Sequence, residues 1–369
     1  MSYDWEAVRH EFPVAQEHVY LNHAQIGPLP QCVTARLREY VDDWCAHGRA
    51  CYSKWEGETE NTRQKVAKLI GASPDEIAFT GSTTSGVLLI SHALGLRPGD
   101  NVLTADLEHP ANVSAWLALS RSGVETRFVK STQGRVLVSH VEAMMDEATR
   151  VVALSFVEFT NGYRNDLVTL GRLCRERGVH FFVDAIQGIG ALRFDVGEYF
   201  VDSLSCGGYK WLLGPLGTAF VYVRRDLIKS MIPPGISWKH TMASNRLRDV
   251  VMRDSDSGEY DLTIPAFEHE YDRYQGAGDA LLPYSARRFE EGMPNLPGMI
   301  GLGAALDLIQ RIGVDRIEQR LCTLTDLLCD KLEAKGYVVL SSRSAGERSQ
   351  IVSFGHETYT GAEPFEELG

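Results

Sequence analysis

Apolar, strand-like runs alternate with helical segments through the middle of the chain. The strand-like runs lie at 101–106, 124–130, 151–159 and 180–185. Segments with helical spacing lie between them, at 111–120, 140–147 and 167–177. This alternation predicts a largely parallel sheet covered by helices. Ligands of such sheets bind off the carboxyl ends of the strands, so polar residues that directly follow a strand are the first candidates for a site.

Two of these strand ends carry an acid and an amine. The run at 181–183 leads directly to Asp184, and the next apolar run, at 201–206, leads through two glycines to Lys210. A lysine amine forms imines with carbonyls, and its pKa shifts readily when it is desolvated. A carboxylate against a heteroaromatic nitrogen keeps that nitrogen protonated. Together they suit pyridoxal phosphate, which is held by a Schiff-base lysine and an acidic partner of its ring nitrogen.

A third strand end is rich in hydroxyl groups. Residues 81–86 read Gly-Ser-Thr-Thr-Ser-Gly and open an apolar helix after a strand that ends at Thr80. Free N–H groups and hydroxyls at a helix N-terminus can bind a phosphate. The alternative is plain N-capping, since Ser and Thr are favoured at that position anyway. The segment is not a P-loop, because no Gly-Lys-Ser/Thr follows.

Two further places offer candidate side chains. His109 follows a strand directly, and its flat imidazole could stack on a cofactor ring; the alternative is a solvated loop histidine. Asn22, His23 and Ala24 precede a Gly-Pro turn and could line the mouth of a pocket. A plain surface loop explains the same three residues.

Composition excludes several classes of function. The net charge is −12 and no basic block compensates it, which argues against a nucleic-acid binder. No run of about 18 apolar residues could span a membrane, and the polar N-terminus does not resemble a signal peptide. Seven scattered cysteines favour a reducing cytoplasm over a disulfide scaffold. With no CxxC or HExxH motif, we expect no metal site.

The length of the chain and the break in its alternation of strands and helices predict two domains. We expect a large domain at 15–290, which includes an irregular insertion at 236–284, and a small α+β domain made of 1–14 and 291–369. Such an insertion is typical of a lid, an oligomer arm or a mobile segment. The small domain should contain helices at 287–313 and 314–334 and strands at 336–342 and 349–355.

These residues carry a resemblance to a known family. The chain resembles the class V aminotransferase superfamily of pyridoxal-phosphate enzymes, which includes cysteine desulfurases, selenocysteine lyases, kynureninase and isopenicillin N epimerase-like proteins. The resemblance rests on Asp184-x-x-Gln187 with Lys210, and on three segments: LNHAQIGPLP at 21–30, GYKWLLGPLG at 208–217 and RRFEEGMPNLP at 287–297. It implies an aspartate-aminotransferase-like α/β fold with a mostly parallel seven-stranded sheet, helices on both faces and a smaller α+β domain. It also implies a homodimer.

The resemblance assigns roles residue by residue. Lys210 matches the lysine that forms the Schiff base and moves protons, and Asp184 matches the aspartate on the pyridinium nitrogen. His109 matches the histidine stacked on the ring, and Gln187 the glutamine on the ring hydroxyl. The phosphate side is matched by Thr83, Thr84, Ser205 and Tyr209.

The chain departs from the family pattern at several positions. Tyr209 stands where many relatives have histidine, Met293 where many have threonine, and Phe159 where asparagine is common. The substrate-binding arginine and the desulfurase cysteine of the family fall beyond Gly369, so we expect a shortened small domain or carboxylate recognition by 236–284.

The reaction implied is chemistry on a small amino-acid substrate through an external aldimine and a Cα carbanion. The resemblance favours β-elimination with C–S cleavage of a cysteine-like substrate. Epimerisation or transamination on the same scaffold is the alternative, and a non-catalytic relative is a third possibility.

Overall fold

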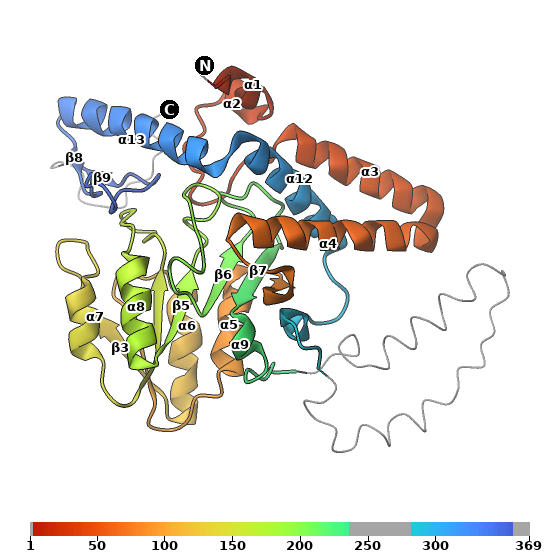
Figure 1. The fold of residues 1–369 in the computed structure, drawn as a ribbon. Helices are drawn as coiled ribbons and strands as arrows, with labels where there is room; N and C mark the ends of the chain where they lie inside the picture. Colours follow the sequence, from red (N-terminus) through yellow and green to blue (C-terminus); the bar gives the residue numbers. More distant parts are fainter. Residues whose placement is uncertain (1–2, 236–281, 357–369) are drawn as a thin grey trace, which may run out of the picture.

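A seven-stranded sheet lies at the centre of the computed structural model, which describes residues 3–235 and 282–356 (Figure 1). Its strands are β1 (Ile77–Thr80), β2 (Asn101–Ala105), β3 (Glu125–Val129), β4 (Thr149–Ser155), β5 (His180–Asp184), β6 (Ser203–Gly207) and β7 (Ala219–Val223). The strand order is β1-β7-β6-β5-β4-β2-β3. Strands β2 to β6 pair in parallel, and β7 runs antiparallel to both of its neighbours. The predicted mostly parallel seven-stranded sheet is confirmed.

Helices cover both faces of the sheet because its strands are apolar on both sides. In β4, Val152 and Leu154 join one core cluster, while Val151 and Ala153 join the other. The first cluster is closed by α7 (Val138–Met144), α8 (Leu167–Arg177) and α12 (Leu296–Ile312). The second is closed by α5 (Thr83–Ala93), α6 (Ala111–Ala118) and α9 (Arg225–Ile228). Burial on both faces is the usual state of a parallel strand.

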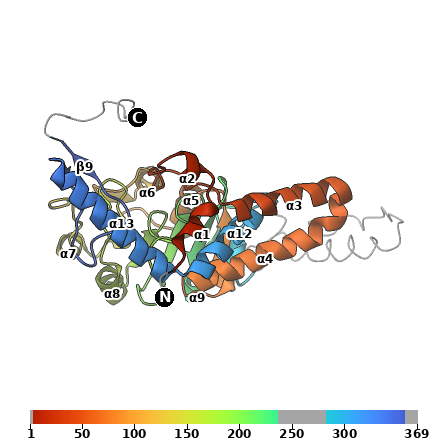
Figure 2. The same ribbon diagram turned by 90° about the horizontal axis from the view of Figure 1, so that it is seen from above.

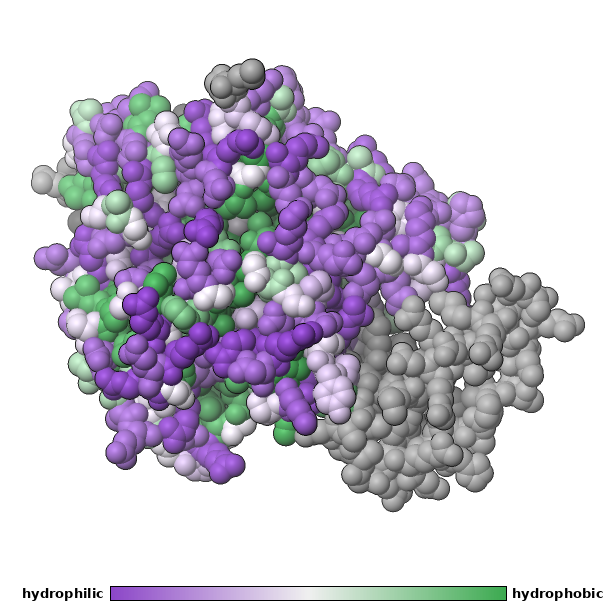
Figure 3. Space-filling model, in the orientation of Figure 1, coloured by the Kyte–Doolittle hydropathy of each residue, from purple (hydrophilic) through white to green (hydrophobic). Residues whose placement is uncertain are grey.

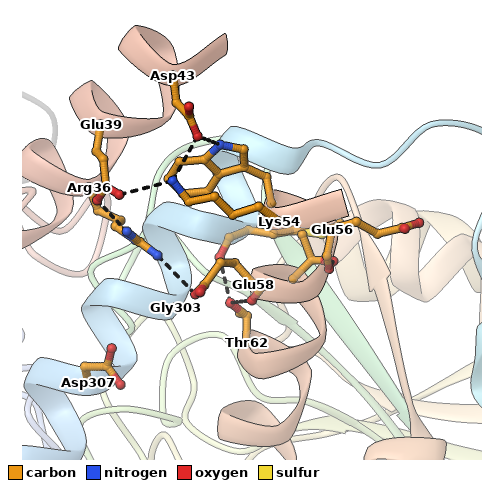
Figure 4. A network of polar contacts seen from close by, with 12 residues as sticks. Arg36, Glu39, Asp43, Lys54, Glu56, Glu58, Thr62, Gly303 and Asp307 are labelled. Carbon is orange, nitrogen blue, oxygen red and sulfur yellow. Dashed lines mark hydrogen bonds and ion pairs between the residues drawn. The ribbon is translucent and has the colours of Figure 1, made fainter. Parts of the chain in front are cut away.

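A helical hairpin extends from the body of the molecule (Figures 1 and 2). It consists of α3 (Gln31–His47) and α4 (Tyr52–Leu69), which are joined by a short 3-10 turn, and it packs on α12. Figure 4 shows the polar contacts between the two helices. The Asp43 carboxylate accepts from Lys54 Nζ at 2.9 Å and from Trp55 Nε1 at 2.8 Å. Arg36 in turn pairs with Glu58 at 3.2 Å.

The C-terminal part differs from the sequence-based expectation. The helix predicted from 287 begins only at Leu296, because Gly292 has a φ of 57° and Asn295 caps the helix by accepting from Gly298 N–H. Helix α13 (Val314–Ala334) has the predicted bounds. The two predicted strands shrink to β8 (Val338–Val339) and β9 (Phe354–Gly355). Serines between them donate hydrogen bonds to a neighbouring loop, as described below.

Two short helices, α1 (Trp5–His10) and α2 (Val14–Glu17), begin the chain. Nearly all of the predicted insertion at 236–284 falls outside the described residues. Within the described residues, no helix has the length and apolar character needed to cross a bilayer. The face in Figure 3 is covered mainly by hydrophilic side chains, with hydrophobic ones in separate patches.

One buried cation joins α4 to the segment that precedes α12. Arg63 is 2% exposed, and its guanidinium donates to Ile77 O at 2.8 Å and to Glu290 Oε1 at 2.6 Å. Glu290 also accepts from Phe79 N–H at 2.9 Å. Removal of the cation would leave the Ile77 carbonyl without this donor and the largely buried Glu290 carboxylate without this counter-charge.

We therefore expect Arg63→Met to destabilise the protein by about 3 kcal/mol, the usual cost of breaking a buried ion pair. Arg177→Met is the matched control, because Arg177 pairs with Glu142 on the surface and such pairs contribute less than about 1 kcal/mol. Melting temperatures of both variants check this. Equal small shifts would contradict the role given to Arg63.

Candidate active site

Asp184 lies at the carboxyl edge of the sheet, between the ends of two parallel neighbours. The register pairs it with Ser155 of β4 on one side and with Ser205 of β6 on the other. Its side chain is 3% exposed and accepts one hydrogen bond, from Ile186 N–H at 3.1 Å. Burial raises the pKa of Asp184 to about 6, and the charge of Lys210 opposes this shift.

Lys210 reaches the same edge from the loop after β6. Burial lowers the pKa of Lys210, and the charge of Asp184 acts in the opposite direction. The two side chains therefore lie within electrostatic reach of each other, as the sequence predicted. The loop is closed by Gly208 N–H, which donates to Thr218 O at 2.8 Å, and by Gly214 N–H, which donates to Gly208 O at 2.7 Å.

The N-terminal loop packs against the lysine loop. Gly27 N–H donates to Tyr209 O at 2.8 Å, and a Cβ at Gly27 would lie 2.2 Å from Lys210 O, so only glycine fits there. His23 stacks on Trp211 with ring centroids 4.5 Å apart and an angle of 12° between the rings. Burial lowers the pKa of His23 to about 4, so this imidazole is neutral at ordinary pH.

Ala24 and Asn22, the other two predicted loop residues, make different contacts. Ala24 offers its carbonyl to Gln187 Nε2 at 3.0 Å, and Gln187 Oε1 accepts from Trp211 Nε1 at 2.9 Å. Gln187 therefore ties the N-terminal loop to the lysine loop and keeps one amide hydrogen for a ligand. Asn22 is exposed and bonds Gln25 at 2.6 Å, so its side chain serves the loop itself.

His109 stands at the same edge, on the loop after β2. Its Nδ1 accepts from Ala111 N–H at 3.1 Å, which places the hydrogen of the neutral ring on Nε2. Phe159 meets the imidazole edge-on, with centroids 4.9 Å apart and an angle of 80°. Burial, and the nearby charge of Lys210, lower the pKa of His109. His109 is thus a neutral, flat ring near the lysine.

The hydroxyl-rich turn makes a cradle for an anion. Ser82 caps α5 by accepting from Ser85 N–H at 3.0 Å. Thr83 Oγ1 is buried without a hydrogen-bond partner, and Thr84 is exposed at the first turn of the helix. A Cβ at Gly207 would lie 2.9 Å from Thr83 Oγ1. An unsatisfied buried hydroxyl at a helix N-terminus fits a phosphate group.

Ser205 and Tyr209 border this cradle. Ser205 is fully buried and donates to Thr83 O at 2.9 Å, so it supports the turn from beneath. A Cβ at Gly86 would lie 2.2 Å from Ser205 Oγ, which explains the glycine in the first turns of α5. The Tyr209 ring lies beside Gly207, and burial raises the pKa of its phenol.

The C-terminal segment holds the loop that carries Phe159. Three serines donate to the carbonyls of three consecutive loop residues, each at 2.6 Å: Ser353 to Thr160, Ser341 to Asn161 and Ser349 to Gly162. Gln350 also donates to Gln187 O. We call these four residues the C-terminal clamp. It connects 341–353 to the edge of the sheet on which the site stands.

The sequence analysis did not single out Glu108, Trp211 or Asn165. Glu108 and Trp211 are adjacent in sequence to His109 and Lys210, which were identified. That position was the available signal. In the described residues, no group of three His, Cys, Asp or Glu side chains could hold a metal ion.

The predicted cofactor fits this arrangement. A phosphate suits the unsatisfied Thr83 hydroxyl and the α5 N-terminus, and the ring nitrogen suits the buried Asp184 carboxylate. The amine of Lys210, with its lowered pKa, is suited to attack an aldehyde carbon. His109 is suited to cover one face of the ring.

Comparisons with known proteins agree with this geometry. The family model described as aminotransferase class V matches residues 19–255 and 277–368. A probable cysteine desulfurase of Methanothermobacter thermautotrophicus is 32% identical over 328 residues, which cover 88% of this chain and 74% of that protein.

Solved structures show the same fold. The cysteine desulfurase of Thermococcus onnurineus superposes with a TM-score of 0.81 at 25% identity, over 97% of this chain and 84% of that one. A cystine C–S lyase in complex with cysteine persulfide superposes with a TM-score of 0.78 at 23% identity, over 93% and 85% of the two chains. The chain belongs to the class V aminotransferase family, and it is a pyridoxal-phosphate-dependent enzyme.

Proposed function

We propose that this protein cleaves the C–S bond of a cysteine-like amino acid by β-elimination. The observation that carries the chemistry at Cα is the placement of Lys210 and Asp184 at one strand edge, next to a neutral His109. A cysteine desulfurase and a cystine C–S lyase among the similar structures support the substrate class.

Each residue has a role that follows from its charge. Bound pyridoxal phosphate supplies an electron sink for the pair released when the substrate loses its Cα proton. The lowered pKa of Lys210 increases the share of free amine, which can remove that proton. Asp184 holds a negative charge against the ring nitrogen, and its buried setting makes that charge effective. Gln187 orients the ring with its remaining amide hydrogen.

The buried thiol of Cys206 is unsuited to accept sulfur from a substrate. Cys206 lies within electrostatic reach of Lys210 and Asp184, but burial raises its pKa well above the usual range, so it stays a thiol. In elimination the sulfur of the substrate leaves with the C–S electron pair, and no enzyme thiolate is needed. The edge of Phe159 is also suited to contact sulfur.

We propose Asn22, His23 and Ala24 as the substrate-side loop, and a homodimer as the assembly. His23 and Ala24 lie against Trp211 and Gln187 next to the lysine, which supports this placement. The division at residue 290 into a large and a small domain likewise stays a proposal.

Incubation with cysteine, cystine and S-substituted cysteines tests the reaction. We expect pyruvate, ammonia and a sulfur product in equal amounts. Keto acid formed together with aminated cofactor would instead indicate transamination, and loss of optical activity without cleavage would indicate epimerisation. Either result would overturn the elimination proposal.

Lys210→Ala should reduce turnover by at least about a thousandfold, because the proton-transferring group is lost. Borohydride should trap the cofactor on the parent protein and not on this variant, as peptide mass spectrometry would show. Lys130→Ala, which changes an 80%-exposed side chain, is the control and should retain both properties. Normal turnover of Lys210→Ala would refute the assignment.

The affinity for pyridoxal phosphate should fall at acid pH. Asp184 without cofactor has a pKa of about 6, so its carboxylate is ionised above that pH and protonated below it. Below about pH 6 binding must first remove a proton, which lowers affinity by up to about tenfold per pH unit. Fluorescence titration at several pH values measures this. Asp184→Asn should bind weakly throughout and lack this inflection; an unchanged inflection would assign it to another group.

A further inference from the structure

Three carboxyl groups are buried together at the carboxyl edge of the sheet. Glu108 is 7% exposed, Glu158 is fully buried and Asp184 is 3% exposed. The charge of Asp184 raises the pKa of both glutamates, and the charge of Glu108 also raises the pKa of Glu158. Like charges at this range in a buried site cannot all be ionised. The described residues place one lysine, Lys210, within reach, and its charge acts on Asp184.

Burial raises the pKa of Glu108 to about 7, and hydrogen bonds that stabilise its anionic form oppose this shift. Ser155 donates to it twice, from its backbone N–H at 2.5 Å and from its hydroxyl at 2.6 Å. Asn112 Nδ2 adds a third hydrogen bond at 3.0 Å. A carboxylate that accepts several hydrogen bonds favours its charged form. Above about pH 7, a proton that stays in this group therefore belongs elsewhere.

Glu158 has the opposite surroundings. Its Oε1 accepts from Asn165 Nδ2 at 2.8 Å, and the same nitrogen donates to Ser155 O at 2.8 Å. Glu158 Oε2 and Asn165 Oδ1 are both buried and both lack a partner. These two unsatisfied atoms belong to the same hydrogen-bonded pair of side chains. A single hydrogen on Glu158 Oε2, donated to Asn165 Oδ1, would satisfy both.

We propose that Glu158 is a neutral carboxylic acid, joined to the Asn165 amide by two reciprocal hydrogen bonds, and that this pair is a positioning element. It fixes the loop in which Phe159 contacts His109, while Asp184 remains the carboxylate that faces the cofactor. Glu158 then does not serve as a general base. The proposal concerns the protein before any substrate binds and does not depend on the reaction assigned above.

The surrounding charges agree with a neutral Glu158. Burial raises its pKa well above the usual range, and the charges of Glu108, Asp184 and Asp106 act in the same direction. These charges come from the ends of β2 and β5. Tyr163, on the loop of Glu158 itself, is a further titratable group nearby, and burial raises the pKa of its phenol. The three carboxylates oppose a negative charge on Glu158, and the hydrogen bond from Asn165 acts in the opposite direction.

Infrared difference spectroscopy of the cofactor-free protein tests the proposal. At about pH 8 solvated carboxyls and Glu108 are ionised, so the carbonyl stretch of a protonated carboxylic acid should report the buried acid that keeps its proton. We expect this band in the parent protein, its loss in Glu158→Gln and its retention in Glu108→Gln. Glu142→Gln changes an exposed carboxylate and is the control that should keep the band.

Two results would overturn the proposal. The parent protein would show no protonated-acid band at about pH 8, or the band would vanish in Glu108→Gln and persist in Glu158→Gln. The second result would place the proton on Glu108. Because no cofactor or substrate is present, failure here is distinct from failure of the proposed elimination reaction.

Thermal melts across pH give a second readout. The unfolded Glu158 ionises near pH 4.3, while the folded group keeps its proton. The parent should therefore lose stability relative to Glu158→Gln as pH rises from about 5 to about 8. Glu158→Gln should retain cofactor affinity, since its amide can make the same pair, whereas Glu158→Ala should weaken it. A difference in melting temperature that does not change with pH would overturn the proposal.

Discussion

The site depends on the parallel pairing of β4, β5 and β6. Their register aligns Ser155, Asp184 and Ser205 at one edge, so three strands end at the same level. Strands buried on both faces leave this edge as the place where polar groups can gather. The charges of Asp184 and Lys210 act on each other there in buried surroundings, where charges interact more strongly than in solvent.

The sequence alone predicted those elements whose ends are set by residues next to them in the chain. Helix α8 has its predicted bounds because Asp166 caps its start and Gly178, with a φ of 64°, ends it. The pair of Asp184 and Lys210 was predicted because each directly follows an apolar run. Contacts between distant segments left no periodic signal: Glu108 bonds Ser155, 47 residues away, and Ser349 bonds Gly162, 187 residues away.

Contacts between distant segments also explain why the two predicted strands near the C-terminus are shorter than expected. Residues 336–342 and 349–355 have apolar character, which predicted a longer pair. Their serine hydroxyls instead form the C-terminal clamp on the loop at 160–162. These hydrogen bonds to the loop take the place of further strand pairing in the small sheet. A pairing of this kind becomes visible only once both segments are placed in space.

Helix α12 belongs to the packing of the large sheet. Met299, Leu302 and Ile309 are buried in the same core cluster as the helices that cover the large sheet. Gly313, with a φ of 90°, separates α12 from α13. Val314, Ile317 and Leu321 of α13 pack against the same cluster, so the described C-terminal helices continue the core of the sheet.

Phe159 also bears on which substrate the site accepts. An aromatic edge next to His109 offers no hydrogen bond to a carboxylate, so recognition of the substrate carboxylate has to come from another element. The same edge favours contact with a polarisable sulfur. The proton-removing machinery of Lys210 and Asp184 is common to several reactions at Cα. The contacts around the side chain of the substrate therefore decide the outcome, and the aromatic edge of Phe159 supports the proposed cysteine-like substrate over a charged one.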